Sequence, residues 1–183
     1  MKSESILIEP QYWGSISYFK ELFLADNIVL DIHSNFQKGT YRNRCKIMGP
    51  NGLLSLSVPL IKGNGQHTVF EDVKISYSEN WRKDHWQSLV SSYRRSAYFE
   101  YYEDSFYPFY NKKEFAFLVD FNLELMNTIC PLLKIPPRIS LSQQYIELSN
   151  EIIDFRTEIS PKNKRLNEME QPSYIQVFSD KLG

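Results

Sequence analysis

The chain has 183 residues, of which 42% are hydrophobic and 23% are charged, a composition that is typical of a globular protein and excludes a disordered chain. Its 21 lysines and arginines are balanced by 22 aspartates and glutamates, so the net charge is −1. This balance argues against a general nucleic-acid binder and leaves small anionic ligands open. The chain also has 12 tyrosines and 12 phenylalanines, which suit either a core or a cleft that stacks on sugars or bases.

The N-terminal residues predict a strand, a helix and a second strand. Residues 5–8 are a short apolar run that Pro10 stops, and residues 28–32 are the next such run. Between them, apolar residues recur at helical spacing from Ile16 to Phe23, and Ser15 precedes them as an N-cap. If the two strands are parallel, this is a βαβ unit.

Polar residues follow both of these strands, at the edge where open α/β sheets bind ligands. Glu9, Gln11 and Tyr12 follow the first strand, and His33 follows the second. We expect these two groups to face one crevice. His33 would then serve as a general base that Asp31 orients from two residues away. The alternative, a histidine whose hydrogen bonds are satisfied at a strand end, has equal weight.

Residues 41–48 and 53–60 predict a β-hairpin across the turn Gly49-Pro50-Asn51-Gly52. Alternation along the first strand places Arg42, Arg44 and Lys46 on one face, with same-face neighbours roughly 6.5–7 Å apart. Two guanidiniums at this spacing can grip a diphosphate, but an edge strand also carries such charges as a solvated face. Cys45, on the opposite face, is expected to be a small buried residue and not a nucleophile.

The rest of the chain predicts one more long strand and two long helices. Residues 69–77 are expected to form the strand, residues 80–96 a helix that Asn80 can cap, and residues 114–133 the longest helix, which Pro131 kinks or ends. Residues 139–141 are a short extended piece, and residues 160–167 a basic polar loop. The expected fold class is α/β, with a mixed β-sheet from the N-terminal half and C-terminal helices packed on it.

The sequence has no standard catalytic signature and indicates no cofactor. Its three histidines are too scattered for a metal site, and the glycine-containing loop 62–67 lacks P-loop spacing. His85 is either a ligand-binding residue or a core histidine, and Arg94 either serves the cleft or solvates a helix end. Two cysteines make no disulfide framework, and no apolar run reaches the roughly 20 residues of a membrane span, so we expect a reduced cytoplasmic setting.

Several sequence blocks together resemble the WbqC-like protein family, from about Ile8 to Phe178. The most specific block is Phe36-Gln37-Lys38-Gly39-Thr40-Tyr41-Arg42-Asn43-Arg44-Cys45. The others, in the same order as in the family, are Tyr12-Trp13 with residues 16–19, then residues 56–59, residues 81–86, residues 92–94 and residues 99–102. Two features depart from the family pattern: the turn Glu9-Pro10 with Gly14, and an end at Gly183 that comes before an expected apolar segment. The chain is therefore either shortened or given without that segment.

The resemblance implies one domain over residues 1–183 and a cytoplasmic enzyme of bacterial surface-polysaccharide biosynthesis of the O-antigen type. It would modify a nucleotide-linked amino sugar by acyl or aminoacyl transfer. We assign His33 and Asp31 to catalysis, and substrate binding to Gln11, Tyr12, Trp13, Lys38, Arg42, Asn43, Arg44, His85 and Arg94. The alternative is a non-catalytic partner of a polysaccharide-synthesis complex with residues 98–110 as its interface. A nucleic-acid-modifying enzyme is a third alternative, which the net charge disfavours.

Overall fold

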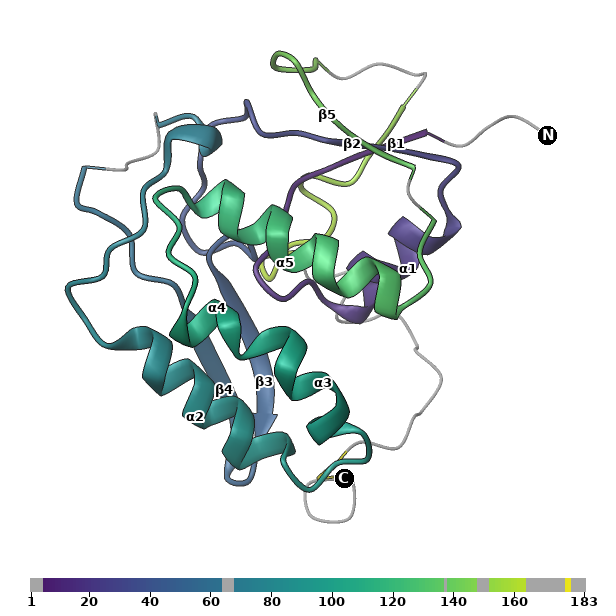
Figure 1. Ribbon diagram of the computed structural model, residues 1–183. Helices are drawn as coiled ribbons and strands as arrows, with labels where there is room; N and C mark the ends of the chain where they lie inside the picture. Colours follow the sequence, from purple (N-terminus) through teal and green to yellow (C-terminus); the bar gives the residue numbers. More distant parts are fainter. Residues whose placement is uncertain (1–4, 64–67, 137, 148–151, 164–176, 179–183) are drawn as a thin grey trace.

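A parallel sheet forms the upper part of the protein in the computed structural model (Figure 1), which describes residues 5–63, 68–136, 138–147, 152–163 and 177–178. Its strands are β1 (Ser5–Ile8), β2 (Asn27–Leu30), β5 (Ile139–Leu141) and β6 (Ile153–Asp154), in the order β5-β2-β1-β6. Every neighbouring pair is parallel. The carboxyl ends of all four strands therefore lie at one edge.

The predicted βαβ unit is confirmed. Helix α1 (Ile16–Leu24) connects β1 to β2, which pair in parallel with Ser5 opposite Asn27. The hydroxyl of Ser15 accepts a hydrogen bond from the backbone amide of Tyr18, as an N-cap does. The buried side chains of α1, Tyr18 and Leu22, pack between the sheet and helix α5 (Leu118–Leu132) in one apolar cluster.

The predicted hairpin is also present, with a shorter first strand. β3 (Arg44–Gly49) pairs antiparallel with β4 (Gly52–Ser57), and Gly52 takes a φ of 115° that favours glycine. Because β3 begins at Arg44, the expected alignment of Arg42 with Arg44 and Lys46 on one strand face is wrong. Arg42 lies in the turn that leads into the strand. The alternation of side chains along β3 therefore does not decide which way its side chain points.

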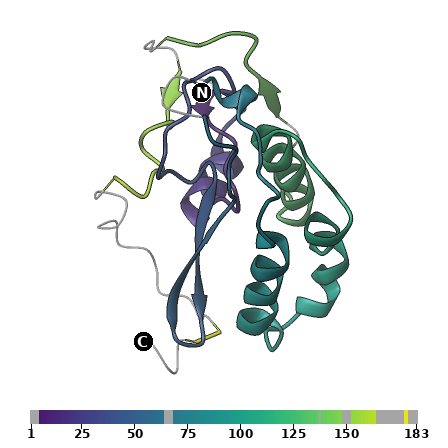
Figure 2. The same ribbon diagram turned by 90° about the vertical axis from the view of Figure 1, so that its left-hand side faces the viewer.

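Helices face this hairpin across a second apolar core. They are α2 (Trp81–Tyr93), α3 (Phe99–Phe106) and α4 (Pro108–Asn111), and Figure 2 shows hairpin and helices as two layers. Cys45 and Leu56 of the hairpin join Trp81, Leu89 and Phe109 in this core. Helix α5 contributes Phe121 to it and Met126 to the cluster under the parallel sheet. One helix thus supports both sheets, and no described helix is long and apolar enough to cross a membrane.

The expected strand over residues 69–77 is wrong. Residues Phe70–Asp72 form a 3-10 turn, and the segment makes single antiparallel bridges to three different places: Val69 to Asn35, Ile75 to Leu60 and Lys74 to Phe117. The last of these bridges keeps residues 114–117 out of the helix predicted over 114–133, so α5 starts at Leu118. At the other end α5 stops at Leu132, directly after Pro131, as the proline predicted.

The packing of α1 predicts different outcomes for two neighbouring substitutions. Leu22 is fully buried, whereas the Phe23 side chain next to it is 57% exposed. We expect Leu22→Ala to lower the free energy of unfolding by about 2–5 kcal/mol, because it leaves a cavity against α5. Phe23→Ala should change it by less than about 0.5 kcal/mol. Urea unfolding followed by circular dichroism measures both, and equal losses would contradict this packing.

Candidate active site

A polar cavity of about 760 Å³ lies at the carboxyl edge of the parallel sheet. Three short segments that follow strands contribute to it: Glu9 after β1, His33 and Ser34 after β2, and Arg156 after β6. We expected residues that follow the first two strands to face one crevice, and Glu9 and His33 both line this cavity. The described residues that line it are Glu9, His33, Ser34, Asn35, Gln37, Arg42, Tyr145, Asp154, Arg156, Thr157 and Glu158.

A buried ion pair joins Glu9 to Arg42 at the base of this polar cavity. Arg42 is 3% exposed, and its Nε and Nη2 both donate to the Glu9 carboxylate, the Nε bond being 2.6 Å long. Its Nη1 donates to the carbonyl of Asn35 at 2.7 Å, and its guanidinium lies over the Phe70 ring. Burial raises the pKa of the Glu9 carboxyl, and the charge of Arg42 opposes this shift. Both members of this ion pair line the cavity, so their charged groups form part of its wall.

A second guanidinium is held between two carboxylates. Arg156 Nη1 donates to Asp31 at 2.7 Å, and Nη2 donates to Asp154 at 2.6 Å. Burial lowers the pKa of Arg156, but the hydrogen bonds and charges of these two carboxylates outweigh it and raise the pKa. Asp31 is fully buried, and its other oxygen accepts from the backbone amides of His33 and Ser34. Asp31 therefore shapes the turn that presents His33.

The His33 imidazole is fixed by groups from elsewhere in the chain. Its Nδ1 lies 3.0 Å from Glu71 Oε1, and its Nε2 lies 3.1 Å from the carbonyl oxygen of Ser142, which follows β5. Asp31, expected to orient the ring, bonds instead to the His33 backbone. Because both ring partners are hydrogen-bond acceptors, both contacts are hydrogen bonds at once only when the ring carries two protons.

Other residues assigned to substrate binding lie outside the polar cavity. Gln11 is buried and donates to the carbonyl of Ile159, and Asn43 donates to that of Val58. Lys38 is exposed and its carbonyl accepts from Lys162, while Arg44 is half-buried at the start of β3. Arg94 is exposed at the end of α2. Of the proposed diphosphate-binding cations, the structure brings only Arg42 into the lining.

Tyr12, Trp13 and His85 belong to a hydrogen-bonded chain in the core. Trp13 Nε1 donates to Tyr110 Oη at 2.6 Å, Tyr110 and Tyr12 hydroxyls are 2.9 Å apart, and Tyr12 Oη lies 2.8 Å from His85 Nδ1. A tryptophan can only donate, so each hydroxyl can donate to the next group, and His85 Nδ1 accepts. His85 does not line the polar cavity. Burial lowers its pKa to about 4, which keeps the ring neutral.

Sequence reasoning missed Glu71, Tyr145, Asp154 and Arg156, which contact or line the site. One signal was available: the apolar pair Ile152-Ile153 followed by Asp154 repeats the pattern Val29-Leu30-Asp31 at the end of β2. Among the described residues, no group of three or more His, Cys, Asp or Glu side chains is arranged to hold a metal ion. Cys45 is buried, which raises the pKa of its thiol to about 12 and leaves it protonated.

The fold and the cavity define an α/β protein with a cavity lined by charged side chains at the carboxyl edge of a parallel sheet. The chain belongs to the WbqC-like protein family, whose model matches residues 9–174. It is similar to "Uncharacterized protein Rv1507c" of Mycobacterium tuberculosis (strain ATCC 25618 / H37Rv), with 28% identity over 153 residues. That alignment covers 83% of this chain but 63% of the relative, so the chain spans less than two thirds of its length. No solved structure matches the chain.

The ion pair of the site predicts a strong dependence of stability on Arg42. Arg42→Met leaves the Glu9 carboxylate buried without a counter-charge, so the free energy of unfolding should fall by about 3–5 kcal/mol. The double variant Glu9→Gln with Arg42→Met removes that charge and should be more stable than Arg42→Met alone. Arg138→Met, which breaks an exposed pair with Asp26, is the control and should cost less than about 1 kcal/mol. Urea unfolding at pH 7 would contradict the pairing if the double variant regained no stability.

His85 predicts a pH dependence of stability. Its pKa is about 4 in the folded chain against 6.5 for the unfolded group, so the unfolded state binds more protons between these pH values. The free energy of unfolding should therefore fall by up to about 3 kcal/mol as the pH falls through this interval. His85→Gln removes the titration and should flatten the slope. Urea unfolding at several pH values measures it, and identical slopes for both proteins would refute the assignment.

Proposed function

We propose that the chain is a cytoplasmic enzyme that transfers an acyl or aminoacyl group to the amino group of a nucleotide-linked sugar, for a bacterial surface polysaccharide. The observation that carries the proposal is the polar cavity, which combines carboxylates, guanidiniums and an imidazole at the ligand-binding edge of the sheet. Carboxylates accept from sugar hydroxyls, and the paired guanidiniums donate to them. The family resemblance supports the polysaccharide setting.

The charges of the cavity suit an amino sugar more than a bare phosphate. Among the described residues, the carboxylates of Glu9, Asp154 and Glu158 line it, and the guanidiniums of Arg42 and Arg156 are already paired with carboxylates. Glu158 is an exposed residue of the lining, and its carboxylate can attract an ammonium group. Lys38 and Arg44 lie outside the lining, so the proposal does not use them as diphosphate ligands.

His33 handles the proton in the proposed reaction. The amine attacks the acyl carbonyl carbon as the neutral base, the new C–N bond forms, and the bond from that carbon to the leaving group breaks. Glu71 keeps its bond to Nδ1 while Nε2, released from the Ser142 carbonyl as a neutral nitrogen, takes the amine proton. Nε2 then passes this proton to the leaving group, so the imidazole ends the reaction neutral. Asp31 acts as a positioning residue through the His33 backbone.

A second candidate function is a non-catalytic partner in a polysaccharide-synthesis complex. Tyr98 and Tyr101, at the start of α3, are 75% and 74% exposed, which favours a contact surface there. If Tyr98→Ser with Tyr101→Ser abolishes polysaccharide synthesis in cells while His33→Gln leaves it unchanged, this function replaces the enzyme. The opposite pattern supports the enzyme.

The proposed enzyme predicts separate effects on binding and turnover. Calorimetric titration with nucleotide-linked amino sugars should give saturable heat, and Glu158→Gln should weaken the affinity about tenfold through loss of a charged hydrogen bond. Glu147→Gln, an exposed carboxylate outside the cavity, should leave it unchanged. His33→Gln should bind but turn over at least about 100-fold more slowly. Absence of heat with every such sugar would reject the proposal.

A further inference from the structure

A second cavity, of about 680 Å³, shares a wall with the polar cavity. Tyr41 lines this aromatic cavity, while Arg42, the next residue, lines the polar one. The segment after β6 also passes from one cavity to the other. Residues 157–158 line the polar cavity, and residues 159–160 line the aromatic one. Two chain segments thus separate a charged chamber from an aromatic one.

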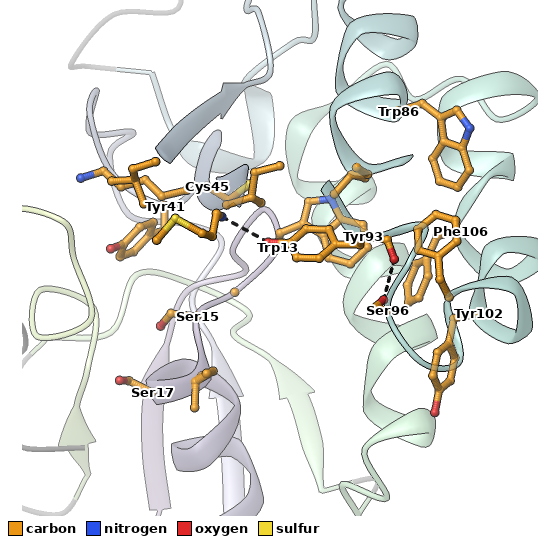
Figure 3. A pocket seen from close by; sticks show the side chains of 18 of the residues that line it. Trp13, Ser15, Ser17, Tyr41, Cys45, Trp86, Tyr93, Ser96, Tyr102 and Phe106 are labelled. Carbon is orange, nitrogen blue, oxygen red and sulfur yellow. Dashed lines mark hydrogen bonds between the residues drawn. The ribbon is translucent and has the colours of Figure 1, made fainter. Parts of the chain in front are cut away.

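Ring faces from several elements gather around the aromatic cavity. Trp13 comes from the turn before α1, Trp86 and Tyr93 from α2, and Phe99, Tyr102 and Phe106 from α3. Figure 3 shows rings from the helices on one side and Tyr41, Ser15 and Ser17 on the other. The charged side chains in its described lining are Lys46 and Glu103, and serines add neutral hydroxyls. Such a site suits a flat, uncharged ring with polar edges.

The Trp13 indole is fixed in place at a cost to the backbone. Trp13 has a φ of 47°, a left-handed conformation that is unfavourable for a bulky side chain. Its Nε1 donates to the Tyr110 hydroxyl, and the centroid of its ring lies 4.9 Å from the ring centroid of Phe106. Gly14 follows, and a Cβ there would lie 2.4 Å from the Tyr18 ring. Strain that surrounding contacts enforce at a cavity wall is a mark of a ligand-binding position.

We infer that the aromatic cavity binds a nucleobase, which stacks on its rings. Aliphatic side chains such as Ile47, Leu53 and Leu89 also line the cavity and would suit an alkyl chain, but only a base would use the rings and the serine hydroxyls as well. The aromatic lining of the cavity supports a flat neutral ring as the ligand. The choice of a nucleobase as that ring rests on the proposed function, in which the substrate is a nucleotide-linked sugar.

Uncharged nucleosides test this inference without involving the polar cavity. Two of the three tryptophans, Trp13 and Trp86, line the aromatic cavity, and Trp81 is buried in the core, so tryptophan fluorescence reports on occupancy. Titration with uridine, cytidine, thymidine, adenosine and guanosine should give saturable quenching with at least one. Tyr102→Ala should weaken that binding about tenfold.

Tyr101→Ala is the matched control, because Tyr101 precedes Tyr102 on α3, is 74% exposed and does not line the cavity. Its affinity should stay within about twofold of the unaltered protein. The inference is overturned if no nucleoside binds, if both variants weaken binding equally, or if octanoate quenches saturably where nucleosides do not. Nucleoside binding without any reaction of nucleotide-linked amino sugars would keep this inference and reject the proposed transferase.

Discussion

The buried ion pair between Glu9 and Arg42 is the interaction on which the rest of the structure depends. It ties the carboxyl end of β1 to the turn that enters β3, and so joins the parallel sheet to the hairpin. Asn122 of α5, fully buried, secures the same junction by donating to the backbone carbonyls of Pro10 and Arg42. A buried charge pair is stable only when its hydrogen bonds are complete, and here Ser34 and Asn35 supply the remaining partners.

This junction also lies between the polar cavity and the aromatic cavity. The Arg42 side chain lies toward Glu9 and lines the polar cavity, whereas its neighbour Tyr41 lines the aromatic one. The backbone carbonyl of Tyr41 accepts from the amide of Tyr12 at 2.9 Å, which brings the Trp13 turn to the aromatic side. A single turn thus positions the charged floor of one chamber and the aromatic wall of the other.

Local sequence patterns predicted the parts of the fold that local contacts determine. The Ser15 cap, α1, the Gly49–Gly52 turn and the end of α5 at Pro131 each depend on residues within a few positions. Residues 69–77 were expected to form one strand, but their bridges go to three separate segments, and only tertiary packing decides that. The site divides in the same way: Glu9 and His33 follow predicted strands, whereas Arg156 meets Asp31 across 125 residues.

The charge balance of the polar cavity limits which part of a ligand it can take. Arg42 and Arg156 are each committed to carboxylates, so neither can neutralise a diphosphate without leaving a buried acid unpaired. His33 lies between Glu71 and the Ser142 carbonyl, two acceptors, so a neutral ring donates to one of them. A neutral or amine-bearing sugar can share these hydrogen bonds without breaking the ion pairs, and a base finds its stacking partners only beyond the wall. The ion pairs of the polar cavity therefore favour a neutral or cationic polar group over a phosphate.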